Sequence, residues 1–363
     1  MKLVLKTFKY RIYPNAQQKG TIEKTLNMCR FLYNNGLEQR IFAYRHRGVS
    51  LSYNKQAIEL PELKRVLPEY KDVHSQVLQD VLKRLDRSFQ NFFRRVSLGE
   101  GKVGFPRFQG KHRYNSFTYP QSGFSIKDNR LHLSKIGAIR INLHRKLVGD
   151  VKTCTITRKN NRYYVSITSE LEKPQVTLTE KSVGIDLGVT HLAITSDGDF
   201  FDNPKHLRKS ERQLKRLQRT VSRRKKGSNR RRKAVQLLAR KHEQIANQRK
   251  DTNHKVSRTL VDNYDLIVFE DLNVQGMVKN KHLAKSIHEV AWKQLVNFTT
   301  YKAEYAGKEV KLVNPQNTSQ ECSSCGAIVK KTLAEREHRC SCGYVAHRDI
   351  NASINILNRG LSA

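Results

Sequence analysis

Three short stretches in the second half of the chain decide the fold: VGIDLGVTHLAIT at 183–195, LIVFED at 266–271 and HRDINASINIL at 347–357. Each stretch carries an acid. Asp186 lies inside an apolar strand, Glu270 ends a buried-type apolar run, and Asp349 opens a helix. Burying a carboxylate is costly unless something binds it, so these acids predict a site rather than a solvated surface.

The order of these elements predicts a ribonuclease-H-like α/β domain. A strand hairpin comes first, a buried strand that ends in an acid comes second, and a helix that opens with an acid comes last. Adjacent strands would bring Asp186 and Glu270 together, and the final helix would place Asp349 beside them. Taken singly, each acid has a plainer interpretation as a cap, an ion-pair partner or a strand-end residue, and Asp349 fits the first turn of any helix.

Three carboxylates around one pocket predict divalent cations, because they cannot all ionise side by side without them. Two Mg²⁺ or Mn²⁺ ions about 3.5–4 Å apart would neutralise the acids. One ion would activate water against a phosphodiester, and the other would stabilise the departing 3′ oxygen. Oxygen ligands suit these hard ions. A serine or cysteine nucleophile has little support, because the chain has no GxSxG motif and its isolated cysteines have no paired histidine nearby.

The cysteines near the C-terminus predict a structural zinc site. Their spacing is C-x2-C-x14-C-x1-C, and the four ligands would be Cys322, Cys325, Cys340 and Cys342. Four thiolates close a tetrahedral zinc shell and leave no open position for catalysis. The second pair is tight, but in an extended segment residues i and i+2 point the same way, so both could reach one ion. His338 is a possible substitute for one of them.

The composition predicts a polyanionic partner. The chain has 363 residues, with 69 Lys and Arg against 32 Asp and Glu, so its net charge is +37. Nucleic acid is the commonest partner of so basic a protein. No run approaches about 18 apolar residues, so no transmembrane span or membrane partner is expected. The N-terminal segment has no apolar run typical of a secretory signal, which together with the cysteine usage predicts a reducing, cytoplasmic compartment.

Residues 205–250 hold 19 Lys and Arg but two acids. The apolar periodicity predicts an antiparallel helical hairpin, with KKGSN at 225–229 as its tip. A charge run is usually a solvated face, but so many like charges would repel one another without a counter-surface, which favours contact with a polyanion. The candidate contacts at the tip are Lys225, Lys226, Arg230, Arg231 and Arg232.

The N-terminal half combines strands and helices. Apolar patterns predict a strand at 3–12, helices at 16–44 and 74–96 with aromatic stripes in the core, and strands over 124–168 that would form a small β-barrel or sandwich. A hairpin loop is expected at 159–162. In the second half a helix is expected from Ser286 to Tyr305, a strand at 308–315, and a last helix from Asp349 to about Leu357 that buries Ile350, Ile354 and Leu357.

The predicted architecture is a multidomain α+β chain. It has a β-barrel-like module, an inserted helical region, a ribonuclease-H-like α/β domain and an inserted zinc ribbon; the family resemblance given below implies that the first three are a wedge module, a recognition region and a RuvC-like nuclease domain. Their expected bounds are 1–14 and 99–172 for the wedge, 15–98 for the recognition region, 173–316 and 348–363 for the nuclease domain including the basic hairpin at 205–250, and 317–347 for the ribbon.

The motifs GIDLG, FEDL, NTSQECSSCG and CSCGYVAHRDINASINI occur in one order over residues 183–357. In this order the chain resembles TnpB, a family of RuvC-like proteins encoded by insertion sequences and related to compact type V CRISPR effectors. The resemblance implies an RNA-guided DNA endonuclease that holds a guide RNA transcribed from the element's end and cuts double-stranded target DNA. It also implies that Asp186, Glu270 and Asp349 bind the catalytic metal ions, and that the four cysteines form the family's zinc ribbon. A protein of this kind would act in the prokaryotic cytoplasm, on the nucleoid, and is expected to be a monomer with its RNA.

The resemblance further implies that the protein reads a short motif beside the target, while guide pairing supplies the rest of the specificity. Candidate readers are polar or aromatic residues of the N-terminal helices and the loop after them: Tyr53, Gln76, Gln79, Asn115 and Ser116.

Three other functions remain open at this point. An RNA-guided repressor without cleavage would bind the same partners, but relatives of that kind should have lost acids. A three-acid DNA transposase would use the same carboxylates, although a zinc ribbon between the second and third acids argues against it. A basic RNA-binding or ribosome-associated protein would explain the charge but not the ordered acids.

Overall fold

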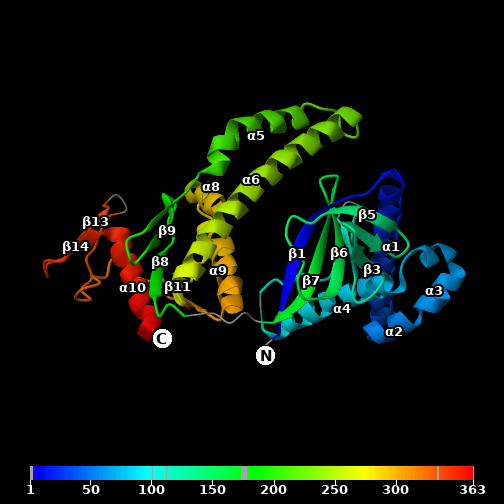
Figure 1. Ribbon diagram of the computed structural model, residues 1–363, viewed down its shortest axis with the longest axis horizontal. Helices are drawn as coiled ribbons and strands as arrows, with labels where there is room; N and C mark the ends of the chain where they lie inside the picture. The colour runs from blue at the N-terminus through cyan, green and yellow to red at the C-terminus, as the bar shows by residue number, and fades with distance from the viewer. Residues whose placement is uncertain (1–2, 100, 112, 173–177, 333–334, 363) are drawn as a thin grey trace. The chain divides into compact units, whose positions relative to one another are not determined.

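The computed structural model describes residues 3–99, 101–111, 113–172, 178–332 and 335–362 (Figure 1). The chain divides into two compact units, Met1–Glu172 and Lys173–Ala363. The first unit holds one antiparallel sheet and the longest helices of the N-terminal half, and the second holds a mixed sheet flanked by helices.

The sheet of the first unit has seven strands in the order β2-β6-β7-β1-β5-β4-β3, all antiparallel. The strands are β1 (Leu3–Tyr13), β2 (Ser116–Tyr119), β3 (Phe124–Lys127), β4 (Arg130–Leu133), β5 (Gly137–Asn142), β6 (Asp150–Lys159) and β7 (Arg162–Glu172). The predicted hairpin loop is confirmed, because Asn160 and Asn161 both have positive φ between β6 and β7, as a tight two-residue turn requires.

The expected barrel or sandwich is one sheet, and no hydrogen-bonded ladder between β2 and β3 closes it among the described strands. These two terminal strands follow one another in the chain, and their Tyr119 and Phe124 rings lie 6.3 Å apart. The sheet therefore curls until its ends meet through side chains, which is why the sequence pattern is that of a barrel.

The predicted long helices of the first unit are confirmed as α1 (Ala16–Arg47) and α4 (Ser75–Ser97). They pack on the sheet around Phe8, Tyr10 and Leu85. The aromatic stripe of α4 was expected to be core, but its distal part is not, since the Phe93 side chain is 57% exposed. Three short helical segments were not predicted: α2 (Tyr53–Ile58), α3 (Leu60–Val66) and η1 (Pro68–Asp72).

The second unit contains a five-stranded sheet in the order β10-β9-β8-β11-β12. Its strands are β8 (Ser182–Asp186), β9 (His191–Thr195), β10 (Phe200–Asp202), β11 (Leu266–Glu270) and β12 (Glu309–Val313). β8, β11 and β12 are parallel, whereas β8, β9 and β10 form an antiparallel meander. β8, β9, β11 and β12 were predicted from the sequence.

The helices of this unit are α5 (His206–Ser222), α6 (Asn229–Asn263), α7 (Val274–Met277), α8 (Lys281–Val290), α9 (Trp292–Ala306) and α10 (Arg348–Ser362). A two-stranded ribbon, β13 (Glu337–Arg339) and β14 (Val345–His347), precedes α10. The predicted basic hairpin is confirmed as α5 and α6 (Figure 1). The second helix runs beyond the expected end at residue 250, to Asn263, because Val256, Leu260 and Val261 pack into the core.

The helix expected from Ser286 to Tyr305 is wrong in one respect, because it is two helices. Ala291 takes a left-handed conformation with φ +56° between α8 and α9. The break lets Trp292 enter the core, where its Nε1 donates a hydrogen bond to the Gly188 carbonyl at 3.1 Å.

The buried face of α10 also differs from the expectation. Ile350, Ile354 and Leu357 are half-buried, while the fully covered residues are mostly small or polar: Asn351, Ala352, Ser353, Asn355, Ile356 and Gly360. The helix approaches the sheet very closely, because a Cβ on Gly184 would lie 2.0 Å from the Ser353 carbonyl oxygen. Bulky side chains cannot occupy that face, so small and hydrogen-bonded ones do.

Candidate functional site

The three predicted acids converge at one edge of the second sheet. Asp186 and Glu270 are the last residues of the parallel neighbours β8 and β11, whose register pairs Ile185 with Phe269. The carboxyl ends of parallel strands face the same edge, where α/β proteins bind ligands. Asp349 lies in the first turn of α10, which packs against β8 at Gly184, and it lies close enough to Asp186 for its charge to raise the pKa of that carboxyl.

The charges of Glu270 and Asp349 act on Asp186. Burial, together with the charges of Glu270 and Asp349, raises the pKa of Asp186 to about 8. Burial also raises the pKa of Glu270. The site therefore holds more negative charge than its surroundings compensate, which is the condition under which a carboxylate cluster binds cations.

The three acids have different hydrogen-bond and ion-pair partners. Thr318 Oγ1 donates a hydrogen bond to Glu270 Oε1 at 2.5 Å. Arg348 Nε lies 3.0 Å from Asp349 Oδ1, and an Arg336 nitrogen lies 3.6 Å from Oδ2. Asp186 has no side-chain partner in the part of the chain that the structure describes. Its carboxylate is thus the least compensated of the three.

These acids do not form one tight ligand cluster, because their oxygens do not all lie within 4.8 Å of one another. A single small ion would need a closer set, whereas two ions a few ångströms apart are bound by more widely spaced carboxylates. The donor set is all oxygen, which fits Mg²⁺ or Mn²⁺. The arrangement is compatible with two hard divalent cations.

The cysteines do form a tight cluster. The sulfurs of Cys322, Cys325, Cys340 and Cys342 all lie within 4.8 Å of one another. Cys322 and Cys342 sulfurs are 3.8 Å apart, and those of Cys325 and Cys340 are 3.6 Å apart. A tetrahedral zinc with bonds of about 2.3 Å separates its sulfurs by about 3.8 Å. The residues therefore fit Zn²⁺.

The tight second pair converges through a turn rather than through the extended segment that was expected. Gly343 has φ +89°, and its N–H donates to the Cys340 carbonyl at 3.0 Å, so Cys342 turns back toward the cluster. His338 does not join the four sulfurs. Its ring is buried, and its Nδ1 contacts the Lys331 ammonium.

The five candidate readers of a DNA motif all lie in the first unit, and most have intramolecular partners. Gln76 accepts a hydrogen bond from the Ser122 N–H, Asn115 accepts one from Arg158, and Ser116 accepts one from Arg84. Tyr53 is half-buried beside Lys83, and Gln79 is exposed on α4. Their role stays a prediction.

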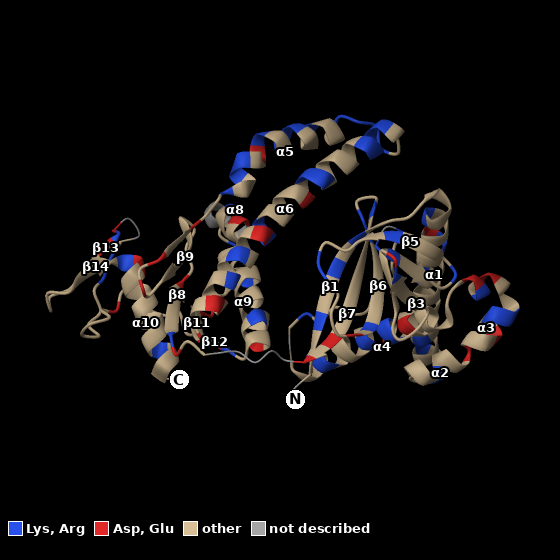
Figure 2. Cartoon of the chain, viewed as in Figure 1, with Lys and Arg blue, Asp and Glu red and all other residues tan. Residues whose placement is uncertain are grey.

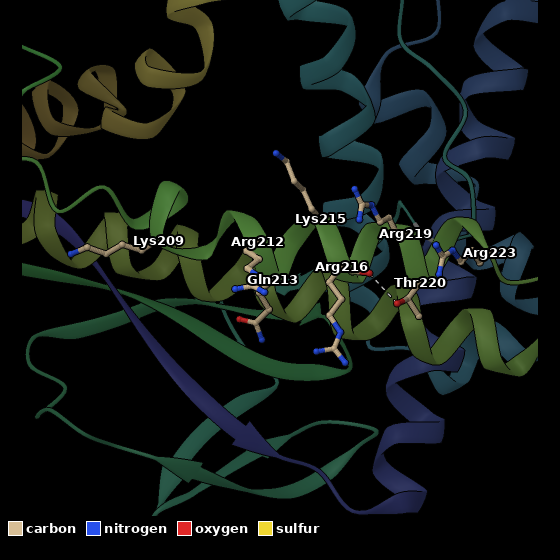
Figure 3. A pocket seen from close by; sticks show the side chains of 8 residues that line it. All are labelled: Lys209, Arg212, Gln213, Lys215, Arg216, Arg219, Thr220 and Arg223. Carbon is tan, nitrogen blue, oxygen red and sulfur yellow. Dashed lines mark hydrogen bonds between the residues drawn. The ribbon is translucent and has the colours of Figure 1, made fainter.

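The predicted tip residues Lys225, Lys226, Arg230, Arg231 and Arg232 lie around the turn between α5 and α6, and all except the half-buried Arg231 are exposed. Figure 2 shows Lys and Arg along both helices of this hairpin. The structure adds a second cationic feature on the shaft of the hairpin. It is a surface groove of about 900 Å³ lined by residues between Lys209 and Arg223 (Figure 3).

Six cations line this groove. Five of them, which follow one another at helical spacing, are named the α5 stripe: Lys209, Arg212, Arg216, Arg219 and Arg223; the sixth is Lys215. Steps of three and four residues place them along one face of the helix. None of the five forms an ion pair within the described ranges, whereas the nearby Lys215 pairs with Glu211 at 3.0 Å. The sequence patterns predicted contacts at the tip of the hairpin and missed this stripe. The helical spacing of the five cations could have identified it.

No helix among the described residues combines the length and apolar character needed to cross a bilayer.

Three family descriptions match parts of the chain. Residues 163–281 match the family described as a probable transposase (OrfB_IS605), and residues 292–356 match the Cas12f1-like TNB domain. Residues 1–48 match a helix-turn-helix domain, although β1 and the continuous α1 form that stretch here.

Two relatives match almost the whole chain. A Streptomyces pristinaespiralis protein named "Putative RNA-guided DNA endonuclease" is 35% identical over 372 residues, covering 100% of this chain and 91% of that protein. "Putative RNA-guided DNA endonuclease InsQ" of Escherichia coli K12 is 34% identical, covering 98% and 92%. The CRISPR-associated endodeoxyribonuclease Cas12f1 of Sulfoacidibacillus thermotolerans is 30% identical over 54% of this chain and 50% of its own length.

Proposed function

We propose that this chain, which belongs to the TnpB family of insertion-sequence-encoded proteins, is an RNA-guided DNA endonuclease that cuts target DNA at Asp186, Glu270 and Asp349. The observation that carries the proposal is the convergence of these acids at one sheet edge, where burial and the charges of Glu270 and Asp349 raise the pKa of Asp186 to about 8. The meander β8-β9-β10 with β11 parallel to β8 supports a ribonuclease-H-like assignment.

The three acids would hold two Mg²⁺ or Mn²⁺ ions. When bound, these ions supply an activated water and stabilise the oxygen that departs from the phosphodiester. Because burial and the charges of Glu270 and Asp349 raise the pKa of Asp186, cation binding there would compete with a proton. Thr318 holds one oxygen of Glu270, and Arg348 balances the charge of Asp349.

The four cysteines would hold one structural Zn²⁺ in a closed sulfur shell. Because no coordination position is left open, this ion contributes folding free energy and no chemistry.

The α5 stripe and the hairpin tip would bind the phosphates of the guide RNA and of its duplex with target DNA. The stripe offers five cations without ion-pair partners among the described residues, and the net charge of +37 suits a partner with dozens of phosphates. Pairing between guide and target carries most of the sequence specificity, and the short flanking motif is read by the first unit, with Tyr53, Gln76, Gln79, Asn115 and Ser116 as candidates. The protein would act as a monomer with its RNA on the prokaryotic nucleoid.

The description of the matching family as a probable transposase favours a second candidate function. Three acids that bind divalent cations also suit DNA strand transfer. This alternative predicts joined DNA ends instead of free ones.

The test is programmed cleavage by the full-length protein. The protein is purified with its RNA, the RNA is sequenced, and plasmids carrying the matching target beside a randomised flank are offered with Mg²⁺. We expect one discrete structured RNA and free DNA ends only at matched targets. Asp186→Ala should keep the RNA and lose cleavage, because it removes the least compensated carboxylate. A random RNA mixture, joined ends, or full cleavage by Asp186→Ala would each contradict the proposal.

A further inference from the structure

Thr318 connects two sites that the chemistry alone would treat as separate. It lies four residues before Cys322, the first cysteine of the cluster, and its side chain contacts the candidate acid Glu270. The residue is 4% exposed, and its hydroxyl donates to Glu270 Oε1 at 2.5 Å. A buried hydroxyl with a carboxylate partner constrains the rotation of that carboxylate.

The segment that carries Thr318 is fixed by α10. Asn355 Nδ2 donates to the carbonyls of Thr318 at 2.9 Å and of Glu321 at 2.7 Å. Asn351 Nδ2 donates to the Glu321 carbonyl at 2.7 Å, and its Oδ1 accepts from the Ser323 N–H at 2.9 Å. These two buried amides, one turn apart on the helix, therefore bond the chain on both sides of Cys322.

One turn further along α10, Arg359 extends the same row of contacts. Its guanidinium donates to Glu321 Oε2 at 2.6 Å and to the carbonyls of Asn314 and Gln316 at 2.8 and 2.7 Å. The segment from the end of β12 to the first zinc knuckle is thus held against the helix that also carries Asp349.

We propose that Thr318 is a positioning residue for Glu270, and that the segment it belongs to couples the cysteine cluster to the acid site, so that a filled cluster tightens divalent-cation binding by the acids. The inference rests on the proposed function, because it assigns the acids a cation. By holding Oε1, Thr318 orients Glu270 Oε2 toward the site. Partners of this kind behind a metal ligand typically contribute about tenfold to a hundredfold to metal affinity.

The coupling follows from the order of the contacts. A filled cysteine cluster fixes Cys322 and its neighbours, Asn351 and Asn355 hold that knuckle and Thr318 together, and Thr318 fixes Glu270. Coupling between two ligands is reciprocal, so emptying the cluster must weaken cation binding at the acids by the same factor by which emptying the acid site weakens zinc binding.

The experiment measures Mn²⁺ binding to the full-length protein by electron paramagnetic resonance of the free ion. It compares the parent protein with Thr318→Val, Thr318→Ser and Asp186→Ala, and zinc content is measured in each. We expect Thr318→Val to bind Mn²⁺ about tenfold to a hundredfold more weakly, with zinc content and melting temperature unchanged. Thr318→Ser keeps the hydroxyl and should restore affinity to within about threefold, a rescue that a purely structural role of the side chain would not give.

A double-mutant cycle then tests the coupling. Cys325→Ser, which removes an exposed cluster ligand, should weaken Mn²⁺ binding in the parent protein and have a smaller effect when Thr318→Val is already present. Additive effects would overturn the coupling. If Cys325→Ser does not fold, the Thr318 series still decides whether Thr318 positions Glu270.

The two proposals fail in different ways. Unchanged Mn²⁺ affinity in Asp186→Ala would show that the acids do not bind the cation, and it would overturn the proposed function as well. Lost affinity in Asp186→Ala together with parent-like affinity in Thr318→Val would overturn the role of Thr318 and leave the nuclease proposal intact. Equal weakening by Thr318→Val and Thr318→Ser would also overturn it, because the hydroxyl would then not be the group that matters.

Discussion

The acid site and the α5 stripe are both clusters of like charge, but they are built in opposite ways. The acids stand on two adjacent strands and a helix and are largely covered, and burial together with the charges of the other two acids raises the pKa of Asp186. The stripe stands on one surface helix and is open to solvent, and its five cations have no ion-pair partner among the described residues. Backbone topology places the first cluster, and side-chain spacing alone places the second.

This difference predicts two kinds of response. Buried carboxylates that lie close enough to interact act as a unit, so a single substitution should remove most of the function of the site. An exposed row of phosphate-binding cations should lose affinity in small, similar steps that depend on salt. Substitutions in the cysteine cluster should act on the acids through the segment that carries Thr318, whereas substitutions in the α5 stripe should act on RNA binding alone. The cysteine substitutions should give the larger effect.

Removal of zinc from the cysteine cluster should lower the rate of cleavage at the acid site and leave RNA binding by the α5 stripe nearly unchanged. We expect Cys340→Ser to lower the cleavage rate at least about a hundredfold, because structural zinc contributes folding free energy to the segment that positions Glu270. RNA affinity should stay within about twofold, since α5 does not depend on the cluster. Cleavage rate and RNA binding are measured on the same preparations, with Ser341→Ala as the neighbouring control. Parallel loss of both activities would show that the two clusters are not independent.

Neutralising the stripe should give the reverse pattern. The triple change Arg212→Gln, Arg216→Gln and Arg219→Gln should weaken RNA binding and reduce its logarithmic salt dependence by about two to three, at about 0.7–0.9 for each phosphate that the protein no longer neutralises. Cleavage by the saturated complex should remain. Filter binding across a salt series measures the slope.

A matched triple at the tip, Arg230→Gln, Arg231→Gln and Arg232→Gln, removes the same charge from the neighbouring turn. If both surfaces bind RNA, the two triples should reduce the slope by similar amounts. A stripe triple with an unchanged slope would mean that these cations face only water.

The positions of the three acids and of the four clustered cysteines could largely be predicted from the sequence. Strand patterns located β8 and β11, and because side chains at the ends of parallel neighbours share an edge, the positions of Asp186 and Glu270 followed. The cysteine spacing identified four sulfurs that the structure brings within 4.8 Å of one another. In each case a local pattern and one topological rule were sufficient.

The remaining features depend on tertiary interactions that no local pattern encodes. Thr318 is an ordinary polar residue in sequence, and its partner Glu270 lies 48 positions away. The break at Ala291 has no glycine or proline to mark it. The polar buried face of α10 follows from the close approach at Gly184, which hydrophobic periodicity could not reveal.

The central claim, that Asp186, Glu270 and Asp349 share divalent cations, is tested most directly by anomalous diffraction from crystals of the protein containing Mn²⁺. Metal binding competes with the proton on a carboxyl whose pKa is raised. The crystals should therefore be kept at a pH about one unit above the Asp186 pKa of about 8. Two anomalous peaks about 3.5–4 Å apart are expected between these three side chains. No peak there, or Mn²⁺ bound only at sites remote from the acids, would contradict it.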